Sequence, residues 1–141
     1  MLATNNAIHR LSINETGSQL RGVAAPVWLT DTSIAVAIDY NAKSNMIYYS
    51  DVSTGEIVEV SINGSQRLVA NDLGVVDGLA VDWTSDLLYY TDTTHDIIGV
   101  VHTSGAPRRT IIESGLDEPK AIALDPANAS VFCGPCHVAS I

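Results

Sequence analysis

Basic residues are scarce in this chain of 141 residues, which carries 7 Lys and Arg against 16 Asp and Glu, for a formal net charge of −9. Nucleic acid is excluded as a partner, because binding it requires clustered cations that neutralise phosphates. No apolar run approaches the roughly 20 residues of a membrane-spanning helix. Residues 1–10 also lack the basic and apolar segments of a signal peptide. Since 46% of the residues are hydrophobic, the chain nevertheless has enough apolar side chains for a folded core.

The sequence also has little from which a catalytic centre could be built. Its two cysteines stand in Cys133-Gly134-Pro135-Cys136, which matches a thioredoxin-type redox motif. That chemistry needs the first cysteine at a helix N-terminus in a βαβ frame, and the surrounding sequence predicts none. None of the four histidines has metal-ligand spacing, and we find no Ser-His-Asp or Cys-His combination and no glycine-rich phosphate loop. We therefore expect neither an enzyme nor a bound cofactor.

What the chain does contain is a repeated tetrapeptide. Tyr48-Tyr49-Ser50-Asp51 and Tyr89-Tyr90-Thr91-Asp92 each follow a short apolar stretch that includes an aspartate. These two lead-in aspartates and a third of the same kind lie 43 residues apart, at Asp39, Asp82 and Asp125. A period of this length indicates a repeat architecture.

Turn signals such as Asn63-Gly64 separate four short strand-like stretches in each repeat, at 34–40, 46–51, 56–62 and 66–70 in the first and at 78–83, 87–92, 96–103 and 108–113 in the second. Four-stranded units of roughly 40 to 45 residues are the blades of β-propellers. The apolar runs 34–38 and 97–101 are nearly continuous, as expected of a sheet that packs against a neighbouring blade on each face. The sequence therefore predicts an all-β fold, a partial β-propeller of about three four-stranded blades.

The repeats divide the chain into segments. We expect a partial blade and connector at 1–33, a first full blade at 34–76, a second at 77–119, the start of a third repeat at 120–132 and a divergent tail at 133–141. About three blades with open edges cannot close a ring. The sequence is therefore interpreted as a fragment, with marginal stability and a tendency to self-associate.

The tetrapeptides and the stretch 77–92 resemble the YWTD repeats, or class B repeats, of the low-density lipoprotein receptor family, with Tyr49 and Tyr90 in place of the family's tryptophan. The likeness is greatest to the first propeller of receptor-related proteins that act as Wnt co-receptors or as the agrin receptor. One departure is the missing arginine after Ile57 and Ile98.

The resemblance implies a six-bladed parent and a non-enzymatic, extracellular module that binds secreted protein ligands, Wnt-pathway or agrin-like, in signalling or endocytosis. Its other partners would be the remaining blades of the parent chain. It would lie on the extracellular side of the plasma membrane and meet the membrane only through a transmembrane segment of that parent.

Two alternatives stay open. A calcium-dependent propeller hydrolase of the lactonase type would hold its ion through residues that differ between blades, whereas Asp39, Asp82 and Asp125 repeat. An extracellular-matrix propeller protein would carry the same repeats.

The recurring residues are expected to be structural, because an active site is built once. The aspartate that ends each tetrapeptide should accept backbone N–H bonds that hold strand to strand. The lead-in aspartates end the predicted innermost strands, where hydrogen-bonded carboxylates are favoured over an ion site. This set comprises Tyr48, Asp51, Tyr89, Asp92, Asp39, Asp82 and Asp125.

The loops directly after the tetrapeptides are the candidates for a ligand-binding face, because loops on a rigid scaffold concentrate binding residues. The residues concerned are Val52, Ser53, Thr93, Thr94 and His95. Three N-glycosylation sequons favour a secreted or luminal parent. They begin at Asn14, Asn63 and Asn128.

Overall fold

The computed structural model describes residues 2–4, 7–9, 11–13, 20–23, 27–28, 33–128 and 130–134. These residues form short antiparallel strands and a single turn of 3₁₀ helix, η1 (Pro126–Asn128). The all-β prediction is therefore confirmed. In the part of the chain that the structure describes, no helix is long and apolar enough to cross a membrane.

Two four-stranded sheets make up the middle of the chain. The first has the order β6 (Ala35–Asn41), β7 (Met46–Asp51), β8 (Glu56–Ser61) and β9 (Gln66–Ala70). The second repeats that order with β10 (Val76–Asp82), β11 (Leu87–Asp92), β12 (Ile97–His102) and β13 (Arg108–Ile112). Each tetrapeptide closes the second strand of its sheet. The strand bounds lie within two residues of those that the turn signals predict.

Smaller sheets flank these two. Before them lie a sheet of β1 (Leu2–Thr4), β2 (Ala7–His9) and β5 (Val27–Trp28), and a pair of β3 (Leu11–Ile13) and β4 (Leu20–Val23). After them β14 (Ile122–Asp125) pairs with β15 (Ser130–Cys133). Cys133 is disulfide-bonded, and Cys136 lies outside the described residues, so the structure gives no further information on the predicted tail.

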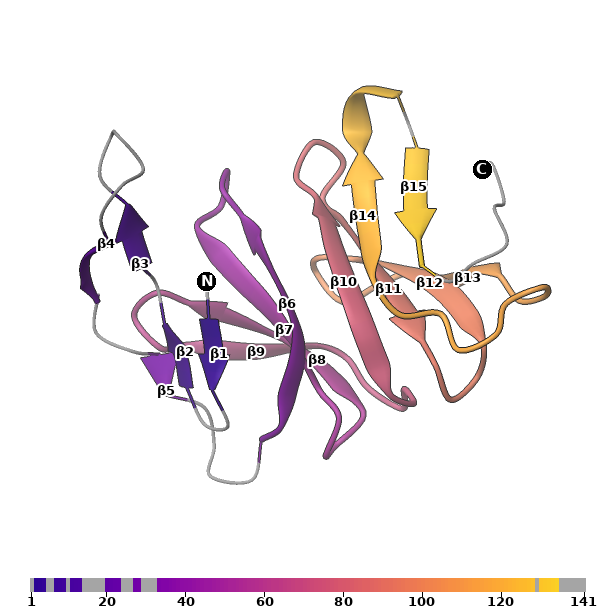
Figure 1. Ribbon diagram of the computed structural model, residues 1–141, viewed down its shortest axis with the longest axis horizontal. Helices are drawn as coiled ribbons and strands as arrows, with labels where there is room; N and C mark the ends of the chain where they lie inside the picture. Colours follow the sequence, from indigo (N-terminus) through magenta and orange to yellow (C-terminus); the bar gives the residue numbers. More distant parts are fainter. Residues whose placement is uncertain are drawn as a thin grey trace.

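The sheets stand next to one another like blades, with β6, β10 and β14 as neighbouring first strands (Figure 1). A buried cluster fills the junction between the first and second four-stranded sheets. It includes Tyr48 from β7 and Tyr90 from β11. Tyr49 faces the opposite way, into a second cluster with Ile8. Both faces of the first sheet are therefore buried, which explains its nearly continuous apolar sequence.

The packing of Tyr90 in this junction requires a glycine at position 99. A Cβ atom at Gly99 would lie 2.2 Å from Cζ of Tyr90, on the strand directly opposite. Because the Tyr90 ring is buried in the junction, it has no room to move aside. Glycine at this position lets the ring lie across the neighbouring strand.

Candidate ligand-binding face

The aspartate that ends the first tetrapeptide organises the loop after it. Asp51 is only 4% exposed, and its Oδ1 accepts hydrogen bonds from the backbone N–H of Ile34 at 3.1 Å and of Ser53 at 3.0 Å. Burial alone would raise the pKa of Asp51. Hydrogen bonds from Ser53, Ile34 and Ser33 outweigh it and hold the pKa below its ordinary value.

Asp92 repeats this arrangement in the second sheet. Its Oδ2 accepts the N–H of Gly74 at 2.8 Å and lies 2.8 Å from Nδ1 of His95. Its Oδ1 accepts the N–H groups of Thr94 and His95 at 3.0 and 3.2 Å. In both sheets one buried carboxylate thus joins the loop after the tetrapeptide to the segment that leads into the first strand.

The antiparallel register brings these loops to one end of the molecule. Ala35 at the start of β6 pairs with Asp51, and Val76 at the start of β10 pairs with Asp92. The loops 51–55 and 92–96 therefore lie beside the starts of the first strands. We call this the Asp51/Asp92 end.

All five residues predicted for the ligand face lie at the Asp51/Asp92 end, but most of their polar atoms hold the turns. Thr93 donates its hydroxyl to the carbonyl of Val75 at 3.0 Å, and the hydroxyl of Thr94 accepts the N–H of Val75 at 2.9 Å. Ser53 donates its hydroxyl to Asp51 at 2.5 Å. The His95 side chain, 56% exposed, still presents much of its ring to solvent.

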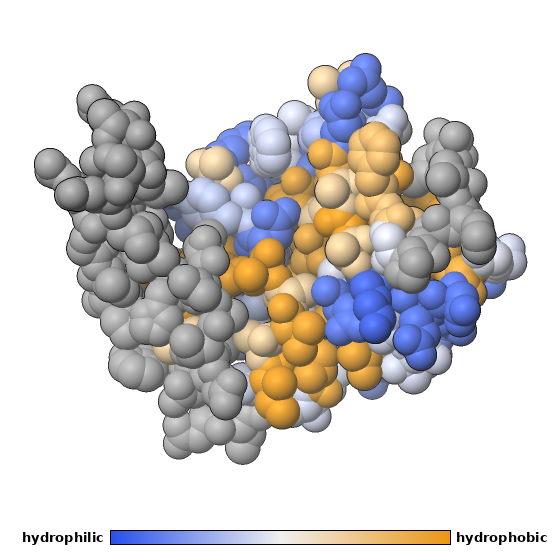
Figure 2. All heavy atoms as spheres, in the orientation of Figure 1, coloured by the Kyte–Doolittle hydropathy of each residue, from blue (hydrophilic) through white to orange (hydrophobic). Residues whose placement is uncertain are grey.

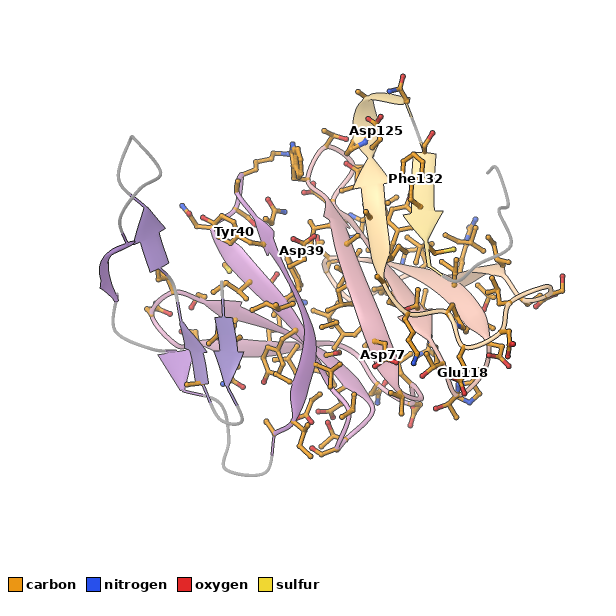
Figure 3. The ribbon with its side chains drawn as sticks, in the orientation of Figure 1. Asp39, Tyr40, Asp77, Glu118, Asp125 and Phe132 are labelled. Carbon is orange, nitrogen blue, oxygen red and sulfur yellow. The ribbon has the colours of Figure 1, made fainter. Side chains whose placement is uncertain are left out.

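Sequence reasoning missed several exposed side chains at the same end. Ile34 is 54% exposed, Val36 46% and Val75 39%, and Figure 2 shows apolar atoms gathered over β6 and β10 in this view. Asp77, at the start of the second repeat, and Glu118, just before the third, lie at the same end (Figure 3). The signal that could have found Ile34 and Val75 is a bulky aliphatic side chain directly before the first strand of each four-stranded sheet.

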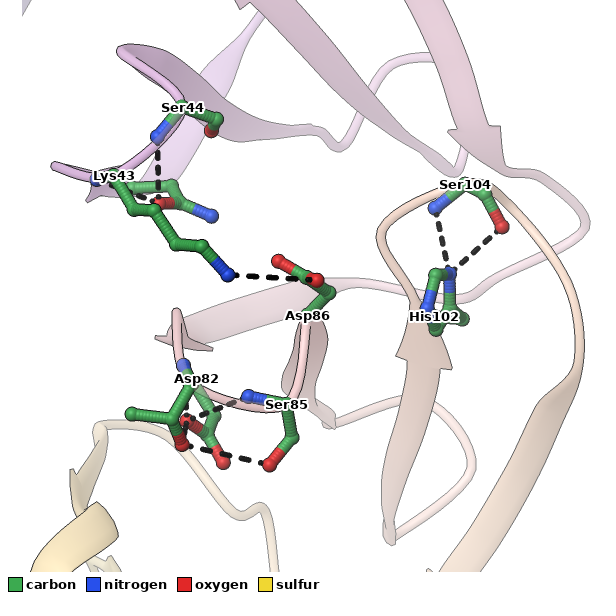
Figure 4. Close-up of polar contacts among 9 residues, drawn as sticks. Lys43, Ser44, Asp82, Ser85, Asp86, His102 and Ser104 are labelled. Atoms are coloured by element: carbon green, nitrogen blue, oxygen red, sulfur yellow. Dashed lines mark hydrogen bonds and ion pairs between the residues drawn. The ribbon is translucent and has the colours of Figure 1, made fainter.

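The lead-in aspartates lie towards the other end, which we call the Asp39/Asp82 end. Asp39 accepts the N–H of Val81 through Oδ2 at 2.7 Å, and so ties β6 to β10. Asp82 caps its own turn by accepting from Thr84 and Ser85 (Figure 4). Burial would raise the pKa of Asp82, but these bonds lower it below the ordinary value.

Asp125 caps the turn after β14 by accepting the N–H of Ala127 at 3.2 Å. A cleft of about 300 Å³ opens nearby, between the second and third repeats, and Asp82, Tyr89 and Asp125 contribute to its lining. Burial, and after it the charge of Asp82, raise the pKa of Tyr89.

No group of three or more His, Cys, Asp or Glu side chains that could hold a metal ion occurs among the described residues. The carboxylates that repeat between the sheets are instead hydrogen-bonded to backbone N–H groups, as described for Asp39, Asp51, Asp82, Asp92 and Asp125. Because these hydrogen bonds hold the turns in place, the two ends of the sheets form rigid surfaces.

In both four-stranded, blade-like sheets the second strand ends in a buried aspartate, as expected of YWTD-type propeller blades. Residues 86–126 match the low-density lipoprotein receptor repeat class B. Over 102 residues the chain is 35% identical to low-density lipoprotein receptor-related protein 5 of Mus musculus, a match that covers 70% of this chain and 6% of that protein. These findings confirm the resemblance to the class B repeats.

The solved structures agree on the fold. A chain from the crystal structure of a nidogen/laminin complex superposes with a TM-score of 0.85 at 22% identity, covering 93% of this chain and 50% of that one. At this identity the likeness establishes the propeller fold alone. The chain thus spans half of that solved chain and a small part of the mouse receptor-related protein.

Proposed function

We propose that this chain is a non-enzymatic, extracellular propeller module of a low-density lipoprotein receptor-related receptor, and that it binds secreted protein ligands of the Wnt-pathway or agrin type. The observation that carries the proposal is the arrangement of the turns at the Asp51/Asp92 end. There two equivalent turns, each held by a buried aspartate, present exposed side chains on a rigid scaffold.

The chemistry of this end suits a protein partner. Ile34 and Val75 are large exposed aliphatic side chains, and patches of this kind often mark interaction sites. Asp77 and Glu118 add negative charge at the same end of the molecule (Figure 3), in a chain of net charge −9. The expected partner surface combines an apolar side chain with basic residues, because charge complementarity favours encounter.

As a receptor module, the chain would act in Wnt signalling or in endocytosis, outside the plasma membrane. Blades of its own parent chain would pack on the outer faces of the described sheets, and a transmembrane segment of that parent would provide the membrane attachment. Similarity to the mouse receptor-related protein supports this setting.

The proposal is tested by immobilising the full chain and measuring binding of a purified Wnt protein and of purified agrin. Val75→Glu places a charge in the exposed apolar patch at the Asp51/Asp92 end. Ile62→Glu is the matched control, since Ile62 is 50% exposed but follows β8 at the other end. We expect Val75→Glu to weaken binding of at least one probe by tenfold or more, about 1.4 kcal/mol, and Ile62→Glu to leave it unchanged.

Lack of binding by the unmodified chain to both probes would contradict the proposed ligand class. An equal loss in the two variants would contradict the assigned face. Circular dichroism of each variant confirms that the sheets are retained. A loss of binding can then be attributed to the substituted surface residue and not to unfolding.

A further inference from the structure

The asparagines of two of the three sequons, Asn63 and Asn128, are among the described residues, and both are at the Asp39/Asp82 end. Ser61 pairs with Met46, which in turn pairs with Asn41, so the turn after β8 lies beside the end of β6. Asn63 is in that turn. Asn128 ends η1, which follows β14 at the same end. Asn14 lies outside the described residues.

Asn63 is arranged so that its amide nitrogen can be substituted without loss to the fold. The side chain is exposed, and its Oδ1 accepts the N–H of Ser65 at 3.1 Å and the hydroxyl of Ser61. Within the described part of the chain no hydrogen bond engages its Nδ2. The space around the turn is also open, because a Cβ atom added at Gly64 would meet nothing within 4 Å.

Asn128 is arranged differently. Its Nδ2 donates to Oδ2 of Asp125 at 2.7 Å, and Asp125 lines the cleft between the second and third repeats. The third residue of this sequon, Ser130, is half-buried in β15, and its hydroxyl donates to the carbonyl of Asn128 at 3.1 Å. A sugar on Nδ2 would compete with the Asp125 contact at the mouth of the cleft.

We propose that Asn63 carries an N-linked glycan and that Asn128 does not, so that the glycan stands on the end of the molecule opposite the ligand-binding face. Transfer forms a bond between Nδ2 of Asn63 and the anomeric carbon of an oligosaccharide donor, a polyprenyl pyrophosphate. The carbon–oxygen bond to the pyrophosphate breaks, the pyrophosphate leaves with the electron pair, and Nδ2 loses one proton.

The folded structure allows this product. Glycosylation replaces a hydrogen on Nδ2 and leaves Oδ1 of Asn63 free to keep its two hydrogen bonds, so the turn retains its shape. The glycan also points away from the loops 51–55 and 92–96, which are at the far end of the strands. The inference concerns this turn alone and holds whether or not the proposed ligands bind.

The test is secretion-pathway expression of the full chain in mammalian cells, behind an added signal peptide and with an added sequon-bearing tag. Peptide N-glycosidase treatment in ¹⁸O-water converts each glycosylated asparagine to a labelled aspartate, which peptide mass spectrometry locates. A labelled tag confirms that the chain met the glycosylation machinery. We expect label at Asn63 in most molecules and unlabelled Asn128.

Two variants sharpen the result. Ser65→Ala removes the sequon but retains Asn63, and should abolish the label and the gel shift attributed to this site. Asn128→Gln should leave the gel mobility unchanged. With a labelled tag, an unlabelled Asn63 overturns the proposal, and so does substantial label at Asn128.

Discussion

Asp51 and Asp92 are the residues on which the repeated turns depend, because each carboxylate collects donors from two separate segments. Asp51 joins Ile34 to the loop at Ser53, and Asp92 joins Gly74 to His95. Removing such a carboxylate leaves buried N–H groups without an acceptor, which costs about 1–3 kcal/mol.

Asp51→Asn keeps an acceptor oxygen but removes its negative charge, and it is predicted to destabilise the chain at pH 7 by about 1 kcal/mol, because hydrogen bonds to a charged acceptor are stronger than neutral ones. The pKa of Asp51 is lower in the folded state than its ordinary value. Its ionised form thus stabilises the fold above the unfolded pKa of about 3.9, and this contribution is lost as pH falls through the folded pKa. Urea unfolding at pH 7 and at progressively lower pH measures the difference, which should shrink in acid.

Asp117→Asn is the control for this experiment, since Asp117 is exposed. It should change stability little at either pH. A loss in Asp51→Asn that stays the same from pH 7 into acid would show that the carboxylate charge is not what stabilises the turn.

The two four-stranded sheets are alike in topology but differ in how they meet their neighbours. In the first sheet the hydroxyl of Tyr48 donates to Glu59 at 2.7 Å, and Arg67 pairs with Glu59 at 2.9 Å. Burial and the Glu59 carboxylate raise the pKa of Tyr48. In the second sheet Val100 takes the place of Glu59 opposite the equivalent tyrosine, Tyr89.

The two junctions also differ in the arginine side chains that cross them. Arg67 also donates to the carbonyls of Thr103 and Ser104 in the second sheet, at 2.6 and 3.1 Å. Arg108 directly precedes Arg109, the residue that corresponds to Arg67 in the strand register, and reaches back to the carbonyl of Asn71 at 2.5 Å. Both arginines thus join the first sheet to the second. The junction with the third repeat, where Tyr89 lies, contains the cleft.

Arg67→Met is predicted to lower the free energy of unfolding by about 1 kcal/mol, because it breaks the bridge to the second sheet but keeps most of the apolar stem. Arg109→Met is the matched control, on the same kind of outer strand and likewise exposed. Chemical denaturation of both variants gives the comparison. Equal effects of the two substitutions would mean that the bridge contributes nothing to the packing of the blades.

The strands could be predicted from sequence because turn dipeptides and apolar runs are local signals. The start of β10 could not be predicted in this way. The strand was expected to begin at Gly78, but a bulge between Val76 and Gly78 lets it begin two residues earlier, at Val76. The exposed patch at Ile34 and Val75 was also missed, because exposure depends on neighbouring segments that local sequence does not reveal. The opposite directions of Arg67 and Arg108 likewise depend on their three-dimensional surroundings.

As a whole, the molecule has two distinct ends. The Asp51/Asp92 end carries the loops after the tetrapeptides and exposed aliphatic side chains. The Asp39/Asp82 end carries the capped turns, the cleft and the turn with Asn63. A ligand on one end and a glycan on the other would not obstruct each other, since the strands between them separate the two surfaces.

Hydrogen–deuterium exchange of the full chain, alone and with a purified Wnt protein or purified agrin, locates the bound surface directly. We predict slower exchange in peptides that cover 52–55 and 93–96 when a ligand is present, and unchanged exchange in peptides that cover 62–65. Slower exchange confined to 62–65, or none anywhere with either ligand, would contradict a ligand-binding face at the Asp51/Asp92 end.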